Sequence, residues 1–128
     1  MKILKNKFFL TAFSVMALVV IVINLMPKPI DMNLEKLGNG QPSVVFVYDP
    51  GLGVSNQQAI EINKARDVIG DKVNFLIVKD GDPTSGGFRA RYRARSADLL
   101  FFNADGEFID RKVALLSAEE FIEAMSGR

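Results

Sequence analysis

The sequence predicts one small α/β domain with a mixed four-stranded sheet, preceded by one long apolar helix. Three observations lead to this prediction. An uncharged apolar run begins at Phe8, two short apolar runs further on are separated by a helical pattern, and an amphipathic segment follows a hairpin near the C-terminal end. About 100 residues follow the first apolar run, which is enough for one compact domain.

The first apolar run is long enough for a membrane span. Phe8 to Met26 contains 19 residues and no charge, and at about 1.5 Å per residue a helix of this length crosses a hydrocarbon core of roughly 30 Å. A cleaved signal peptide is the alternative, but no small-x-small site follows Leu25. We therefore expect residues 1–26 to form a short cytoplasmic N-terminus and an uncleaved signal-anchor helix.

The charges around this run predict its orientation. Three lysines precede it, and one, Lys28, follows it closely, so the positive-inside rule keeps the N-terminus in the cytoplasm. In a bacterium the protein would cross the inner membrane once and place its domain in the periplasm. Residues 27–42, rich in proline and glycine, are the predicted linker, with a short element around 32–37.

Two buried strands form the centre of the predicted sheet. Ser43–Tyr48 and Val73–Val78 are continuous apolar runs, typical of strands buried on both faces. Between them the pattern predicts a helix over about residues 56–69, with Ser55 and Gln58 as its capping box. The intervening helix makes the two strands parallel, with a right-handed crossover.

A hairpin and a final helix complete the predicted domain. Leu99–Phe102 and Glu107–Val113 read as its strands, with Gly106 supplying the positive φ of the turn. The alternation in the second strand indicates an edge position. Ser117 and Glu120 form a capping box for the last helix, whose apolar residues recur at helical spacing.

This order of elements resembles the thioredoxin superfamily over about residues 41–125. The run VVFVY leads into a turn and helix, and LLFFNADGEFIDRKV precedes SAEEFIEAM. The resemblance implies a three-layer α/β/α sandwich over residues 43–128. In that family a CxxC pair follows the central strand, and a cis-proline faces it. Here Leu52 and Ser55 stand at the cysteine positions and Ala97 at the proline position, so we expect a trans bond there.

The composition restricts the chemistry of the domain. Cysteine and histidine are both absent, which excludes thiol-disulfide exchange, Ser-His-Asp and Cys-His catalysis and the usual zinc ligands. We therefore expect no catalytic residue, no cofactor and no metal, and no oxidoreductase activity. Beyond the three lysines of the N-terminus, 13 basic residues face 15 acidic ones, a balance that argues against nucleic-acid binding.

The loop after the first strand is the candidate partner-binding site, because the resemblance places substrate contacts there. Two other interpretations stay open: a plain turn, with Ser55 capping the helix, and a phosphate site on backbone N–H groups, although the loop has only two glycines and no P-loop lysine. The candidate residues are Tyr48, Gly51, Leu52, Gly53, Val54, Ser55 and Ala97.

A second candidate is a basic patch of four arginines at alternate positions. It overlaps the end of a short helix predicted from Thr84 or Ser85 to Arg93. The patch is either a solvated face paired with nearby aspartates or a docking surface for an acidic partner or lipid. Two functions therefore remain: a protein-interaction module in a membrane-associated complex, which we favour, and a membrane-tethered enzyme with non-thiol chemistry. The patch comprises Arg89, Arg91, Arg93 and Arg95.

Overall fold

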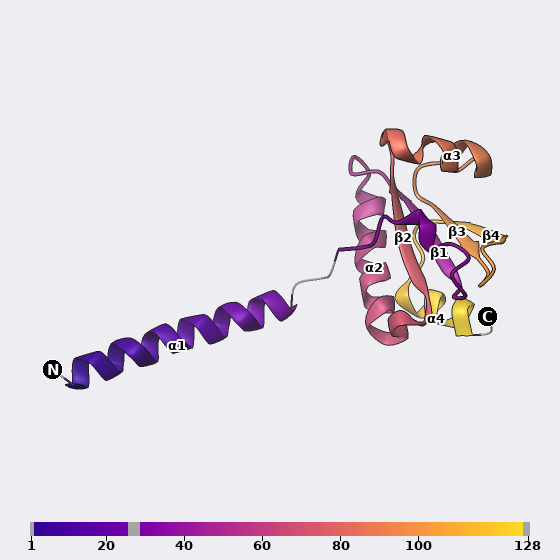
Figure 1. Ribbon diagram of the computed structural model, residues 1–128. Coiled ribbons are helices and arrows are strands. Elements are labelled where there is room, and N and C mark those ends of the chain that lie inside the picture. Colours follow the sequence, from indigo (N-terminus) through magenta and orange to yellow (C-terminus); the bar gives the residue numbers. More distant parts are fainter. Residues whose placement is uncertain (1, 26–28, 127–128) are drawn as a thin grey trace.

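The computed structural model describes residues 2–25 and 29–126 of the chain (Figure 1). Helix α1 (Lys2–Leu25) lies to one side of the folded domain. Every described side chain of α1, over residues 6–21, is exposed. Within the described parts of the chain, no helix has both the length and the hydropathy of a membrane span.

A mixed four-stranded sheet forms the centre of the domain, as the sequence predicts. The strand order is β2-β1-β3-β4. The first two strands are parallel, whereas β3 runs antiparallel to both β1 and β4. The predicted central strand, hairpin and edge strand are thus confirmed. The strands are β1 (Ser43–Tyr48), β2 (Asn74–Lys79), β3 (Asp98–Phe102) and β4 (Phe108–Val113).

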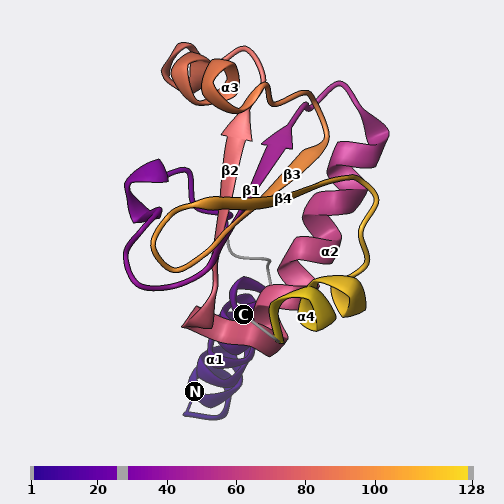
Figure 2. The same ribbon diagram turned by 90° about the vertical axis from the view of Figure 1, so that its right-hand side faces the viewer.

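Helices cover both faces of this sheet and give the expected three layers (Figure 2). The α2 and α4 helices lie together on one face, and α3 lies towards the other. Short 3-10 turns complete the connections. The helical elements of the domain are η1 (Leu34–Lys36), α2 (Gly53–Ile69), η2 (Gly70–Lys72), η3 (Pro83–Ser85), α3 (Gly86–Tyr92) and α4 (Ala118–Ser126).

Alternate side chains of the central strand supply two separate cores, because successive residues of a strand point to opposite faces. Val44 and Phe46 pack with residues of α2 and α4, including Ile62 and Phe121. The other face holds Val45 and its neighbours, packed against α3 and η1. Residues 44–47 are at most 1% exposed, which explains why this segment is apolar without alternation. The second core comprises Val45, Val47, Leu76, Val78, Ala94, Leu100 and Phe102, with Leu34, Leu37, Phe88 and Tyr92 against it.

The start of α2 differs from the prediction. The helix begins at Gly53, three residues early, with extended Leu52 as its N-cap and no side-chain cap bond. Ser55 is therefore inside the first turn, where its Oγ accepts the Asp49 N–H at 3.3 Å. Gln58 points into the core. The predicted Ser55–Gln58 capping box is wrong, because both side chains are used by more distant parts of the fold.

The hairpin and the last helix follow the prediction closely. Gly106 has a φ of 86°, and a Cβ on it would come within 3.0 Å of the Gly38 backbone, so both the turn and the packing require glycine. At the start of α4 the Ser117 Oγ accepts the Glu120 N–H at 3.2 Å, and the Glu120 carboxylate accepts the Ser117 hydroxyl at 3.1 Å. The second predicted capping box is confirmed.

The segment before β1 packs against the sheet. The Asp31 carbonyl accepts the Ile77 N–H at 2.8 Å, which forms a parallel bridge at the outer side of β2. Further along, the Gly40 N–H donates to the Ala104 carbonyl at 3.1 Å. The short element predicted around 32–37 is η1. Residues 31–41 of the predicted linker therefore cover one edge of the sheet, whereas residues 27–28 lie outside the described part of the chain.

Candidate functional site

The candidate loop leaves the C-terminal end of β1 in a tight turn. The Asp49 Oδ1 accepts the Gly51 N–H at 2.9 Å, and the Asp49 carbonyl accepts the Leu52 N–H at 3.0 Å. Asp49 is thus a turn residue. A Cβ at Gly51 would meet Asp49 Oδ1 at 3.3 Å, so the turn favours a small residue there. Neither glycine of the loop has a positive φ, and nothing in the structure explains Gly53.

Leu52 and Ser55, the two positions that the resemblance matches to cysteines, have opposite exposures. Leu52 is 39% exposed at the start of α2, whereas Ser55 is fully buried. The Ser55 hydroxyl is engaged by the Asp49 backbone, so it is a structural group that no substrate reaches. The N-terminus of α2 therefore has one exposed side chain, Leu52, and one buried side chain, Ser55, and neither of them is a thiol.

Tyr48 lies beside the beginning of α2. Its hydroxyl donates to Asn56 Oδ1 at 2.6 Å, and its ring is edge-on to Phe46 at 6.3 Å between centroids. Val54, in the first turn of the helix, is half-buried. The exposed Leu52 and the partly exposed Val54 and Tyr48 thus leave apolar side-chain surface at this end of α2.

Ala97 lies next to the end of β1. Its N–H donates to the Val47 carbonyl at 2.9 Å, and its own carbonyl accepts the Ala114 N–H at 2.9 Å. The bonds on both sides of Ala97 are trans. Its φ is 71° and its side chain is buried. Because Ala97 is small and buried, this position before β3 presents little side-chain surface to a partner.

Several backbone N–H groups of this loop are already hydrogen-bonded, which leaves fewer of them for a phosphate. A phosphate needs unengaged backbone N–H groups at a helix N-terminus. The Gly51 N–H already binds Asp49, the Ser55 N–H donates to the Leu52 carbonyl at 3.1 Å, and the Asn56 N–H donates to the same carbonyl at 3.4 Å. The Asp49 carboxylate adds a negative charge beside the loop. Among the described residues, no group of three or more potential metal ligands gathers anywhere.

The basic patch is divided between two kinds of structure. The α3 helix ends at Tyr92, and Arg93 follows it as a left-handed C-cap with a φ of 51°. Arg89 forms an ion pair with Asp80, which also accepts the Ser96 hydroxyl at 3.0 Å. This pairing is the one expected of a solvated face. Arg91, Arg93 and Arg95 are exposed, and together with Arg111 of β4 they keep one end of the domain basic.

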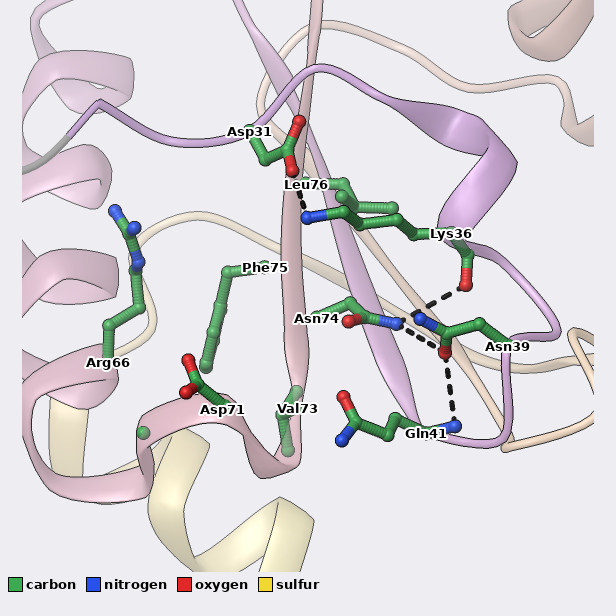
Figure 3. Close-up of a pocket in the computed structure, with 11 residues that line it drawn as sticks. Asp31, Lys36, Asn39, Gln41, Arg66, Asp71, Val73, Asn74, Phe75 and Leu76 are labelled. Carbon is green, nitrogen blue, oxygen red and sulfur yellow. Dashed lines mark hydrogen bonds and ion pairs between the residues drawn. The ribbon is translucent and has the colours of Figure 1, made fainter.

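A polar cleft on the outer side of β2 was not predicted (Figure 3). It has a volume of about 360 Å³. Asn74 organises it: its Nδ2 donates to Asn39 Oδ1 at 2.9 Å, to Ser43 Oγ at 3.0 Å and to the Lys36 carbonyl at 3.3 Å. These partners are 31 to 38 residues away in the sequence, so no local pattern points to them. The cleft is lined by Asp31, Lys36, Asn39, Gln41, Arg66, Gly70, Asp71, Val73, Asn74, Phe75 and Leu76.

Among comparisons with known proteins, the one with solved structures identifies the fold. No protein-family model matches the chain, and no curated protein matches its sequence. Among solved structures, a thioredoxin-like protein from Clostridium perfringens is 13% identical, with a TM-score of 0.68 over 77% of this chain and 79% of that one. Thioredoxin-2, a component of the malaria parasite protein secretion machinery, is 15% identical, with a TM-score of 0.62 over 69% and 84%. StoA from Bacillus subtilis is 13% identical, with a TM-score of 0.60 over 77% and 96%.

The chain thus has a thioredoxin-like fold, and it contains no cysteine. Identities this low establish the fold alone. The activity of the neighbours therefore cannot be carried over to this chain.

Proposed function

We propose that this protein is a non-redox thioredoxin-like module that binds another protein through the loop Tyr48–Ser55, and that α1 holds it at a membrane. One observation carries the proposal: exposed Leu52 and buried Ser55 lie at the N-terminus of α2, at the positions where the resemblance places thiols. A surface of this kind can hold a chain but cannot exchange disulfides with it.

The apolar character of the loop supports protein binding. Leu52 is 39% exposed, and two further partly exposed side chains, Tyr48 at the end of β1 and Val54 in the first turn of α2, lie close to it in the chain. Aromatic and aliphatic anchors of this kind are common at the centres of protein interfaces. The basic end of the domain, formed by Arg91, Arg93, Arg95 and Arg111, would then favour a partner with acidic residues near its binding segment.

The membrane tether rests on the sequence of the N-terminal region. Phe8–Met26 has 19 uncharged residues, and its described side chains, over 8–21, are exposed rather than covered by the domain. Side chains 22–26 lie outside the described part. Exposed apolar side chains in a row favour an apolar environment, such as the surface or the interior of a membrane. The lysines before it favour a cytoplasmic N-terminus and a domain in the periplasm.

Site-specific photocrosslinking in intact cells tests the binding site. A photoreactive amino acid at position 52 is expected to give adducts with a limited set of proteins. The matched control is position 60, because Ile60 is also an exposed apolar residue of α2, 56% exposed, and lies outside the loop. If position 52 gives no adduct that position 60 lacks, the loop is only a turn and the proposal is wrong.

A further inference from the structure

The outer side of the edge strand β4 offers backbone groups to a further strand. In the described parts of the chain, β4 pairs with β3 alone. The Ala114 N–H donates to the Ala97 carbonyl at 2.9 Å, which fixes the alternation of the antiparallel ladder. Ala114, Lys112 and Asp110 therefore direct their backbone groups towards β3, whereas Arg111 and Val113 direct theirs outwards. In agreement, the Arg111 N–H donates to the Asp110 side chain at 2.8 Å instead of to β3.

Charged side chains of β4 lie on both faces of the sheet. Arg111 lies on the α3 face, where its guanidinium donates to the carbonyls of Tyr92 and Arg93 and is 3.8 Å from the Asp98 carboxylate. Lys112 lies on the other face, with its Nζ 6.0 Å from the centroid of the Phe101 ring. Asp110 shares that face with Lys112, because residues two apart in a strand point the same way.

We propose that β4 pairs antiparallel with β4 of a second copy of this chain, about a twofold axis through Arg111. In this register each Asp110 lies directly opposite Lys112 of the other copy. The ladder between β3 and β4 is regular from Asp110 to Val113, and its register shifts beyond Asp110, so the regular part of the edge includes both of these charged residues. The dimer thus gains two opposite-charge pairs across the new strand boundary.

Neighbouring registers do not have this complementarity. A twofold axis through residue 110 would place two Asp110 carboxylates opposite each other, and an axis through residue 112 would do the same with two Lys112 ammonium groups. Like charges directly opposite in a sheet are destabilising. The axis through residue 111 also places two like charges, the Arg111 guanidinium groups, directly opposite each other. Each of them, however, donates to the carbonyls of Tyr92 and Arg93 and lies 3.8 Å from the Asp98 carboxylate of its own chain, which offsets the repulsion, and this register alone adds two Asp110–Lys112 pairs.

A competing explanation is that the charges protect the edge. Natural edge strands often carry charged residues that discourage pairing, and the Asp110 side chain occupies the Arg111 N–H that a second strand would use. That explanation predicts a monomer at any concentration. Pairing with a second copy requires the carboxylate to leave this N–H for Lys112 of the other copy. The two explanations therefore differ in whether the chain associates at all, and in whether that association depends on the charges at positions 110 and 112.

Disulfide trapping on the full-length chain in detergent micelles distinguishes them. The natural chain has no cysteine, so Arg111→Cys provides one thiol per chain, at the proposed axis. Residues paired there have Cα atoms about 5.5 Å apart, within the range that a disulfide spans. Gln57→Cys, at an exposed position of α2, is the control for random collision. The position 111 variant is expected to form disulfide dimers well above the level of the control.

Charge variants then test the register. In the Arg111→Cys chain, either Asp110→Lys or Lys112→Asp alone places like charges opposite each other, and the rate of crosslinking should fall about tenfold. An equimolar mixture of the two chains restores both opposite-charge pairs, so it should form mixed dimers at the original rate. The same charge variants should also be made in the chain that keeps Arg111. In sedimentation experiments, each single charge variant should associate more weakly than the parent and than the equimolar mixture of the two variants.

Three results would overturn the proposal. The first is crosslinking at position 111 no faster than at position 57. The second is equal crosslinking by the single charge variants and the parent. The third is a chain with its natural Arg111 whose association does not respond to the charge variants. All variants share α1. Association through that helix alone would therefore give equal crosslinking by the charge variants and the parent, which is the second of these results. The surface is separate from the loop Tyr48–Ser55, and the loop crosslinking and these experiments can succeed or fail independently.

Discussion

The side chain of Gln58 is hydrogen-bonded to both backbone groups of Leu116. Its Nε2 donates to the Leu116 carbonyl at 2.8 Å, and its Oε1 accepts the Leu116 N–H at 2.6 Å. Gln58 is fully buried. The Gln58 amide thus hydrogen-bonds the backbone N–H and the carbonyl of one residue, as a residue of a neighbouring β-strand would. These two bonds fix the segment between β4 and α4 against α2.

Gln58→Ala should therefore destabilise the protein strongly. The change leaves a buried N–H and a buried carbonyl without partners, and each such group costs about 1–3 kcal/mol. We expect the free energy of unfolding, measured by urea denaturation, to fall by about 3 kcal/mol. Gln57→Ala, at the exposed neighbouring position, is the control and should change it by less than about 0.5 kcal/mol. Equal effects of the two substitutions would show that the Leu116 contact contributes nothing.

Leu52→Asp should separate binding from folding. Leu52 is the N-cap of α2 and makes no side-chain cap bond, whereas aspartate is a preferred N-cap residue and also favours the positive end of the helix dipole. The melting temperature should therefore stay the same or rise. Partner adducts trapped from a crosslinker at position 54 should nevertheless be lost, because a charge enters an apolar contact. Persistence of these adducts in a folded variant would place the interaction elsewhere.

Restoring thiols tests whether the loop keeps the geometry of a CxxC site. In the double variant Leu52→Cys and Ser55→Cys, an intramolecular disulfide should form on oxidation, and the helix N-terminus should lower the pKa of the thiol at position 52. Mass spectrometry with thiol alkylation measures the first effect, and the pH dependence of alkylation measures the second. The single Leu52→Cys variant is the control. A double variant that stays reduced under mild oxidant would mean that the loop has lost this geometry.

The ion pair between Asp31 and Lys36 predicts a small dependence of stability on pH. The hydrogen bond from Lys36, together with that from the Asn33 N–H, lowers the pKa of the Asp31 carboxyl from 3.8. A lowered pKa in the folded state stabilises the fold above the unfolded-state pKa, and this contribution is lost as the pH falls through the folded-state value.

Asp31→Asn should accordingly reduce stability at pH 7, and the difference from the wild type should vanish in strong acid. The Asp31 side chain is 38% exposed, so solvent and salt limit the effect to within about 1 kcal/mol. Urea denaturation at pH 7 and at pH 2.5 measures it. Asp71→Asn, in the same cleft, is the control. A difference from the wild type that grows in acid would contradict this account.

The proposed topology predicts that the domain is accessible from outside the cytoplasm. Protease added to spheroplasts should remove the domain while the N-terminus before Phe8 stays protected, because its lysines favour the cytoplasmic side. An epitope at each end of the chain and a cytoplasmic marker protein complete the experiment. A protected domain would invert the orientation, and recovery of a shorter soluble form would show that the apolar run is cleaved.

The sequence was sufficient to predict the fold because the elements of this domain have strong local signals. The run Ser43–Tyr48 was predicted with its observed bounds, since a strand buried on both faces needs uninterrupted apolar residues. The Ser117 capping box was also predicted correctly, because its bonds join residues three apart in the chain. Local patterns decide such elements, and the sequence displays them directly.

The candidate site was harder to predict, because its important contacts are not local. Ser55 and Gln58 have the spacing of a capping box, but one binds the backbone of Asp49 and the other reaches a residue 58 positions away. The network around Asn74 likewise joins separate segments of the chain. In each case a polar side chain serves a distant backbone or side-chain group, and the sequence carries no periodic signal for such a choice.

The central place of β1 has a consequence for how the protein is made. Its two neighbours in the sheet are β2, which follows it after one helix, and β3, which is synthesised about 50 residues after β1. Until Asp98–Phe102 emerges from the ribosome, one edge of the most apolar strand in the domain has no partner, and Phe46 lacks the cover that α4 provides. Chains that end before β3 should therefore be prone to aggregation. The last quarter of the chain is in this sense required before the first strand of the sheet is fully buried.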